Sequence, residues 1–265
     1  MFAIRSLGCD ATHGSDFHAY MPSGWDCYMI LFVKTPALFI FGEESTYTQP
    51  GTFVLFNKST PLNYRAVTDR YIDDWIHFKG EDALVHSLGI PFDKPVFIGN
   101  GVPIADFFKL MTASFMTENS YRHITCSLLL NSLLTSVSGF LCIDYKLRSY
   151  YGQLLELRRD IFSHPEKKWS NPIMAERLNV SNAHFQELYK LTFGISVGAD
   201  VIRMRVSAAQ NLLTNTNLPI REVASSCGYS NEIHFSRQFR QMTGFTPSDY
   251  RKHGGKIERY PLIDI

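Results

Sequence analysis

The sequence lacks the cysteine pattern of a secreted or zinc-binding domain. Its five cysteines are scattered along the chain, and no two of them have the Cys-x-x-Cys spacing of a metal or redox site. An odd number without close pairs also excludes a disulfide framework, so we expect a reducing compartment. The first twenty residues contain no apolar stretch long enough for a secretory signal.

A long uninterrupted hydrophobic run is also missing. The longest apolar stretch, 127–142, is broken by Asn131 and by several serines and threonines, and it falls short of the ~20 residues that a membrane span needs. Extended disorder is excluded as well, because 45% of the residues are hydrophobic and 14% are aromatic. We therefore expect a folded cytoplasmic protein of one or two domains with no membrane span.

The chain has little net charge, but that charge is unevenly distributed. Residues 1–150 carry 11 basic and 14 acidic side chains, whereas residues 151–265 carry 15 basic and 11 acidic ones. The positive balance in the second part weakly indicates a polyanionic partner there.

The first hundred residues have the pattern of an all-β unit. Short aromatic and β-branched runs alternate with turn sequences rich in Pro, Gly, Asn and Ser, and this spacing is typical of a small barrel or sandwich. The predicted strands include 27–33, 38–41, 52–56 and 71–78.

A helical period replaces the strand pattern after Val102. It predicts two helices, and the second carries an apolar stripe that could either pack on the barrel or form a dimer interface. Sequence alone leaves these two roles open. The stripe comprises Leu129, Leu130, Leu133, Leu134, Val137 and Leu141.

The second part of the chain contains an internal repeat with an offset of 50 residues. Phe185 and Tyr189 recur as Phe235 and Phe239. Each copy follows a short helix with a small residue and a turn residue, Asn179 in the first copy and Gly228 in the second. A small residue at a helix crossing, a turn residue that tolerates the left-handed conformation and apolar anchors together predict a helix-turn-helix, here in duplicate.

A predicted long helix at 195–215 joins the two units. At 1.5 Å per residue it spans about 30 Å, close to the ~34 Å between successive major-groove faces of DNA. The anchored sides of the second helices leave other side chains pointing outward as candidates for reading bases. These candidates are Asn182, Ala183, Gln186, Glu187, Glu232, Ile233, His234 and Arg237.

The region from Leu154 to Lys252 resembles the AraC/XylS family of transcription regulators. The matching positions of the second unit are Ile220, Val223, Ala224, Gly228, Tyr229, Phe235, Phe239, Gly244, Pro247 and Tyr250. The resemblance implies that the second helix of each unit enters the major groove of double-stranded promoter DNA. Glu187 departs from the family, whose members often have a basic residue there; an acid would accept a hydrogen bond from cytosine N4 or point away from phosphate.

The first half resembles the cupin-like sensing barrel of sugar-responsive members of this family, through the motifs at 49–64 and 75–78. The resemblance places Lys34, Tyr64, Asp73 and Trp75 in an effector pocket. Lys34 and Asp73 replace an arginine and a histidine of the sugar-binding precedent. An indole face with charged groups could still bind a sugar. A core position for Trp75, a turn position for Tyr64 and an exposed edge position for Lys34 are the alternatives.

A cupin-type metalloenzyme is the competing class of protein. Such an enzyme needs closely spaced imidazole and carboxylate ligands, and the predicted barrel strands offer His77 alone. We therefore expect no enzyme activity, no metal and no cofactor.

These observations predict an α+β protein. It has an N-terminal cupin-like β-barrel followed by two helices, and an all-α domain with two helix-turn-helix units joined by a long helix. We expect a regulator, in the first instance an activator, that senses a sugar or sugar derivative, recruits RNA polymerase and forms a homodimer. A regulator that responds to a non-sugar effector is the alternative. The predicted segments are 1–142 for sensing and dimerisation, 143–152 as linker, 153–253 for DNA binding with helix-turn-helix units at 172–193 and 221–242, and 254–265 as a tail.

Overall fold

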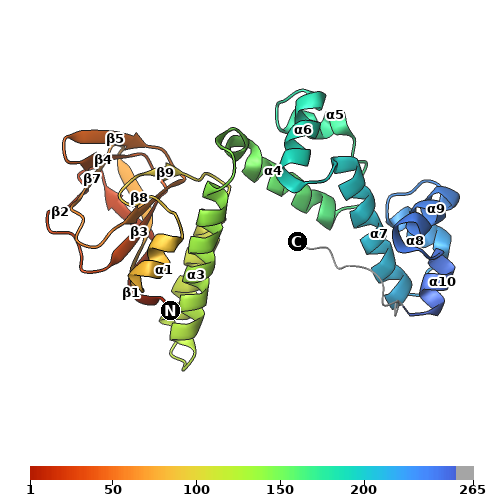
Figure 1. The fold of residues 1–265 in the computed structure, drawn as a ribbon, viewed down its shortest axis with the longest axis horizontal. Coiled ribbons are helices and arrows are strands. Elements are labelled where there is room, and N and C mark those ends of the chain that lie inside the picture. The colour runs from red at the N-terminus through yellow and green to blue at the C-terminus, as the bar shows by residue number, and fades with distance from the viewer. Residues whose placement is uncertain (255–265) are drawn as a thin grey trace. The chain divides into compact units, whose positions relative to one another are not determined.

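The computed structural model describes residues 1–254, so most of the predicted tail, 255–265, lies outside the described residues. The chain divides into two compact units between Gly152 and Gln153. We call them the β unit and the helical unit (Figure 1). The predicted α+β class and the predicted order of strands and helices are confirmed.

The β unit contains two antiparallel sheets. One sheet has the strand order β1-β8-β3-β6-β9 and the other has the order β2-β7-β4-β5. The strands are β1 (Ala3–Gly14), β2 (His18–Met21), β3 (Tyr28–Val33), β4 (Ala37–Phe41), β5 (Glu44–Thr48), β6 (Thr52–Phe56), β7 (Leu62–Ala66), β8 (Arg70–Lys79) and β9 (Val96–Phe97).

The central strands of the five-stranded sheet, β3 and β6, are buried on both faces. In β3, Met29 and Leu31 pack toward the four-stranded sheet, while Tyr28 and Ile30 pack toward the helices that cover the other face. Successive side chains of a strand point to opposite faces, which explains why every residue of β3 is apolar and buried. The β unit therefore has three layers: the smaller sheet, the larger sheet and the helices.

The covering helices are α1 (Asp82–Ser87), α2 (Ile104–Met116) and α3 (Arg122–Leu141). Of the predicted apolar stripe on α3, Leu130, Leu133, Leu134 and Val137 are fully buried in the core beneath the larger sheet. Within the stripe, these four positions therefore belong to the interior of one chain. Leu128, on the opposite side of α3, is exposed.

Helix α3 is long and apolar enough to cross a membrane by length and composition alone. It runs for 20 residues, longer than the apolar stretch recognised in the sequence. Its apolar side packs on α2 and on the sheet of its own unit, as the core helix of a folded domain does.

The helical unit begins within α4 (Tyr145–Ser163). Most of the predicted linker, 143–152, is helical, because α4 starts at Tyr145 and continues across the boundary between the units. Leu154, Leu157 and Ile161 form its buried stripe. The remaining helices are α5 (Asn171–Arg177), α6 (Asn182–Phe193), α7 (Val197–Asn215), α8 (Ile220–Ser226), α9 (Glu232–Thr243) and α10 (Pro247–Lys252).

Candidate DNA-binding face and candidate effector site

Helices α5 and α6 form the first helix-turn-helix. Asn179 in the turn has φ 55°, the left-handed conformation that asparagine tolerates better than most residues. Ser181 caps α6, because its hydroxyl oxygen accepts a hydrogen bond from the backbone N–H of His184 at 3.2 Å. Phe185 and Tyr189 are buried, which fixes the rotation of α6 and the side that it exposes.

Helices α8 and α9 repeat this arrangement. Gly228 has φ 81°, and a Cβ atom at this position would lie 2.7 Å from the backbone oxygen of Glu166, so a side chain is excluded by space as well as by conformation. Asn231, which sequence reasoning did not single out, caps α9: its side-chain oxygen accepts hydrogen bonds from the backbone N–H groups of Ile233 and His234 at 2.8 and 3.0 Å.

All eight predicted base-reading residues are exposed on α6 and α9. On α9 they border an open hollow of about 800 Å³ to which Ile233, Ser236 and Arg237 contribute. On α6, Glu187 lies 3.8 Å from the imidazole of His184. The outward sides of the two helices are therefore available to a partner and carry hydrogen-bonding groups.

A buried polar network holds the first helix-turn-helix against α4 and α7. The carboxylate of Asp200 accepts hydrogen bonds from Nε of Arg158 at 2.8 Å and from the hydroxyl of Tyr189 at 2.7 Å. The guanidinium of Arg158 also lies over the ring of Phe193. Burial, followed by the interaction with Asp200, raises the pKa of Tyr189. The buried carboxylate of Asp200 therefore has a hydrogen-bonding partner on α4 and another on α6.

Helix α7 joins the two helix-turn-helix units and determines the distance between them. It has 19 residues, or about 28 Å at 1.5 Å per residue, and Ser196 caps its first turn. The second helix-turn-helix packs against α10 through Phe239 of α9 and Tyr250 of α10, whose ring centroids are 5.4 Å apart.

Residues 174–253 match the family model described as "Helix-turn-helix domain". The chain is 32% identical over 104 residues to the HTH-type transcriptional regulator MtrA of Neisseria gonorrhoeae, which covers 39% of this chain and 35% of that protein. It is 33% identical over 78 residues to the arabinose operon regulatory protein of Escherichia coli, covering 29% and 27%. The DNA-binding domain of AdpA, solved in complex with a target DNA, aligns with 26% identity, a TM-score of 0.37, and coverage of 38% of this chain and 90% of that one.

The helical unit therefore carries a helix-turn-helix DNA-binding domain. These similarities agree with the resemblance of this region to the AraC/XylS family. The chain spans 35% and 27% of the length of these two curated relatives.

Three of the four predicted effector residues lie on the inner side of the β unit. Tyr64 and Trp75 pack in the cluster between the two sheets, and Asp73 shares their side because it alternates with Asp74 along β8. Tyr64 is buried against the rings of Phe39 and Tyr71. Trp75 is half-buried and lies across Gly8, which has no side chain to block the indole.

Asp73 is a buried acid with an unsatisfied oxygen. Only 1% of the residue is exposed, and its Oδ1 has no hydrogen-bond partner within the described residues. Burial raises the pKa of the Asp73 carboxyl to about 7, against a smaller lowering by the nearby Tyr71 hydroxyl. Unsatisfied buried carboxylates are uncommon, and they require a structural or functional explanation.

Lys34 points to the opposite face of the sheet from Tyr64, Asp73 and Trp75. It follows β3 on the side facing the helices, where its ammonium lies 2.6 Å from both Asp10 and Asp74. The strand alternation is the physical reason, because Asp74 and Asp73 point to opposite faces of the sheet. Burial lowers the pKa of Lys34, but hydrogen bonds from its ammonium to the two carboxylates raise it overall.

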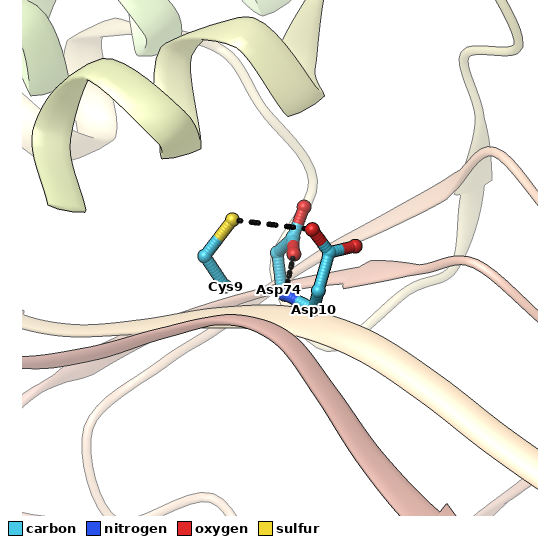
Figure 2. Close-up of side chains that lie close together, drawn as sticks. All are labelled: Cys9, Asp10 and Asp74. Atoms are coloured by element: carbon cyan, nitrogen blue, oxygen red, sulfur yellow. Dashed lines mark hydrogen bonds between the residues drawn. The ribbon is translucent and has the colours of Figure 1, made fainter. Parts of the chain in front are cut away.

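Cys9, Asp10 and Asp74 lie close together (Figure 2). Both carboxylates pair with Lys34. The potential ligand atoms of the three residues are within 4.8 Å of one another, which sequence spacing did not predict. Asp10 has φ 54° at an irregularity of β1, and this conformation lets its backbone N–H donate to Asp74. The ammonium of Lys34 supplies one positive charge beside the two carboxylates of this cluster.

His77 lies apart from that cluster. Its Nδ1 is 3.7 Å from the Cys27 sulfur, its ring contacts Trp25 and Trp75, and burial lowers its pKa. Among the described residues, no group of potential metal ligands includes a histidine.

Proposed function

We propose that this protein is a sequence-specific transcription regulator that binds double-stranded promoter DNA through α6 and α9. The observation that carries the proposal is the repetition of one helix-turn-helix in a single unit, with equivalent sides of both second helices exposed. The ~28 Å length of α7 is suited to placing the two helices in successive major grooves, which recur about every 34 Å.

The β unit is proposed to bind a small-molecule effector between its sheets, at Tyr64, Asp73 and Trp75. A buried carboxylate with a free oxygen beside aromatic rings supports this location. A sugar remains the proposed ligand class, through stacking on Trp75, although Lys34 lies on the other side of the sheet.

The remaining parts of the proposal concern assembly and output. We infer a cytoplasmic homodimer that acts as an activator by recruiting RNA polymerase when effector shifts the population of the binding-competent state. Exposed Ile124 and Leu128 on α3, rather than the buried leucines, are then the apolar residues of that helix available to a second copy.

The DNA-binding proposal is tested with the full chain and DNA selected from a random library. Fluorescence anisotropy should show tight binding to the selected site in the presence of excess competitor. Affinity for unrelated DNA should be weaker and should fall steeply with salt, because phosphate contacts release counterions. Equal affinity for all sequences would contradict the proposal.

The effector proposal is tested by titrating a panel of pentoses and hexoses. Trp75 should report binding by a fluorescence change, and Trp75→Ala should still bind operator but respond only at much higher sugar concentration. Trp169→Phe, in the helical unit, is the control. A response unaltered in Trp75→Ala would exclude Trp75 from the site.

A further inference from the structure

The two outward faces carry opposite chemistry at equivalent positions of the repeat. The 50-residue offset sets Glu187 of α6 against Arg237 of α9, and Ala183 against Ile233. Both helices are rotated identically by their buried aromatic residues, so these pairs occupy corresponding places on the DNA-facing side. The two units should therefore prefer different bases.

Arg237 is free to contact DNA. It is exposed, and no hydrogen bond or ion pair engages its guanidinium within the described part of the chain. Other arginines of the unit are committed: Arg205 donates to the carbonyl oxygens of Pro165 and Lys167, and Arg251 donates to that of Leu218. An arginine with two free N–H groups matches the N7 and O6 acceptors of guanine.

Ile233 is the most exposed large hydrophobic residue of α9, with 80% of its surface accessible. It precedes Arg237 by one helical turn, so the two side chains lie on the same side about 5–6 Å apart. Successive bases are about 3.4 Å apart along a strand. The methyl group of a thymine within about two base pairs of the guanine would therefore cover Ile233.

The face of α6 also carries a pair of amides, at the positions that correspond to Glu232 and Ser236 of α9. Nε2 of Gln186 donates to Oδ1 of Asn182 at 3.2 Å. The pair then presents a donor from Asn182 and an acceptor from Gln186, and exchanging O and N in both amides would still leave one of each. Adenine presents the complementary N7 acceptor and N6 donor.

Glu187 reinforces the difference. Its carboxylate can only accept hydrogen bonds, so it disfavours guanine, whose major-groove edge also only accepts. It favours a base with an exocyclic amino group, which adenine and cytosine have. The α6 face thus combines an acid with amides. The α9 face carries the arginine and the isoleucine beside Glu232 and His234.

We propose that each chain recognises an operator of two chemically opposite parts: α6 selects bases that offer an amino group, with adenine at the Asn182–Gln186 pair, and α9 selects guanine with a neighbouring thymine. The parts should lie about one helical turn apart. This inference rests on the proposed DNA-binding function and names the sequence class that it reads.

The α9 assignment is tested on the selected operator with single-atom base analogues. Arg237→Ala should weaken binding about 5- to 150-fold at that site, and 7-deazaguanine, which lacks N7, should weaken the wild type but not the variant further. Replacing the thymine by uracil removes one methyl group and should cost the wild type about 4-fold. Ile233→Ala should be insensitive to that replacement.

The α6 assignment is tested with purine in place of adenine, which removes the N6 amino group. The wild type should lose several-fold in affinity, and Gln186→Ala should show no further loss. Gln153→Ala on α4 and Arg159→Ala, also on α4, are matched controls that keep the full analogue effect. All substituted side chains are exposed, and circular dichroism checks that each variant folds.

A transplant provides the sharpest test. Glu187→Arg places the guanidinium of the second unit at the equivalent position of the first, and repeated selection should change the base read by α6 to guanine while leaving the α9 part unaltered. Equal base preferences in both parts, or analogue effects that persist in the alanine variants, would overturn the proposal. If selection returns no preferred site at all, the DNA-binding function itself fails instead.

Discussion

The helical unit and the β unit each bury an aspartate, but the two carboxylates differ in their hydrogen-bond partners. Asp200 in the helical unit is enclosed by Arg158 and Tyr189, which donate to its carboxylate. Asp73 in the β unit is equally buried, yet its Oδ1 has no partner within the described residues. The buried acid of the helical unit therefore has two hydrogen-bonding partners, whereas the buried acid of the β unit keeps one oxygen without a partner.

The largest expected effect comes from charging the interior of the β unit. Replacing both Leu133 and Leu134 by Lys removes two fully buried side chains, each worth about 2–5 kcal/mol, and buries two charges. The loss should exceed the total stability of a typical domain, and the protein should be insoluble or unfolded by circular dichroism.

The control is Ile124→Lys with Leu128→Lys on the exposed side of the same helix. This variant should remain folded, and sedimentation should show a monomer if that side forms the dimer interface. A folded, soluble Leu133/Leu134 variant would contradict the core position of these residues.

The next effect concerns the satisfied acid. Asp200→Ala leaves Arg158 and Tyr189 without their shared acceptor, so chemical denaturation should show a loss of about 3–5 kcal/mol. Asp160→Ala breaks an exposed pair with Arg177 and should cost at most about 1 kcal/mol. Similar losses in both variants would remove the distinction between a buried network and a surface pair.

The turn of the second helix-turn-helix should tolerate substitution less well than the turn of the first. Gly228→Val places a β-branched residue at φ 81° and against the backbone of Glu166, with an expected loss of about 3 kcal/mol and of DNA binding. Asn179→Gly relieves a left-handed asparagine and should be nearly neutral by thermal melting. An unchanged melting temperature for Gly228→Val would mean that the turn can rearrange.

The smallest effect, and the one with the opposite sign, concerns the unsatisfied acid. The folded-state pKa of Asp73, about 7, lies above its unfolded value, so the unfolded state loses its proton first and stability falls as the pH rises from about 4 to 7. At about 1.4 kcal/mol per pKa unit, ionisation costs up to about 4 kcal/mol above pH 7. Burying the amide of Asn still costs about 1–3 kcal/mol.

Asp73→Asn should therefore gain about 1–3 kcal/mol at pH 8 and little or nothing at pH 4, as measured by urea unfolding across this range. Asp74→Asn is the neighbouring control on the opposite face and should destabilise, because it weakens the pair with Lys34. A loss of stability at pH 8 in Asp73→Asn would indicate a partner for this carboxylate and would remove the contrast with Asp200.

The DNA-binding part was predictable because its signals are local. A turn residue, a capping residue and anchors spaced along one helix determine which side chains point outward, and all lie within about twenty residues. Asn231 was missed although asparagine directly before a helix is a recognisable cap. The pairing of Asp200 with Arg158 could not be predicted, because 42 residues separate them and no spacing rule connects α4 with α7.

The candidate effector site was only partly predictable, because the positions of strands depend on partners far away in the sequence. Strand β1 was not recognised in the sequence. Gly8, Asp10 and the irregular register between them interrupt the alternation of apolar and polar residues that marks a strand. The position of Lys34 depended on which face of the sheet the residue after β3 points to. The apolar pattern of α3 identified a buried side but could not distinguish the same chain from a second copy as the partner.

By itself, the sequence determined the α+β order of the chain, the repeated helix-turn-helix and the set of residues that α6 and α9 expose, because helix periodicity and turn chemistry act over a few residues. Tertiary structure alone decided that Leu133 and Leu134 belong to the core of one chain, that Lys34 pairs with Asp74, and that Oδ1 of Asp73 lies inside without a hydrogen-bond partner. These outcomes depend on strand register and on packing between segments far apart in the chain, and no local pattern encodes either.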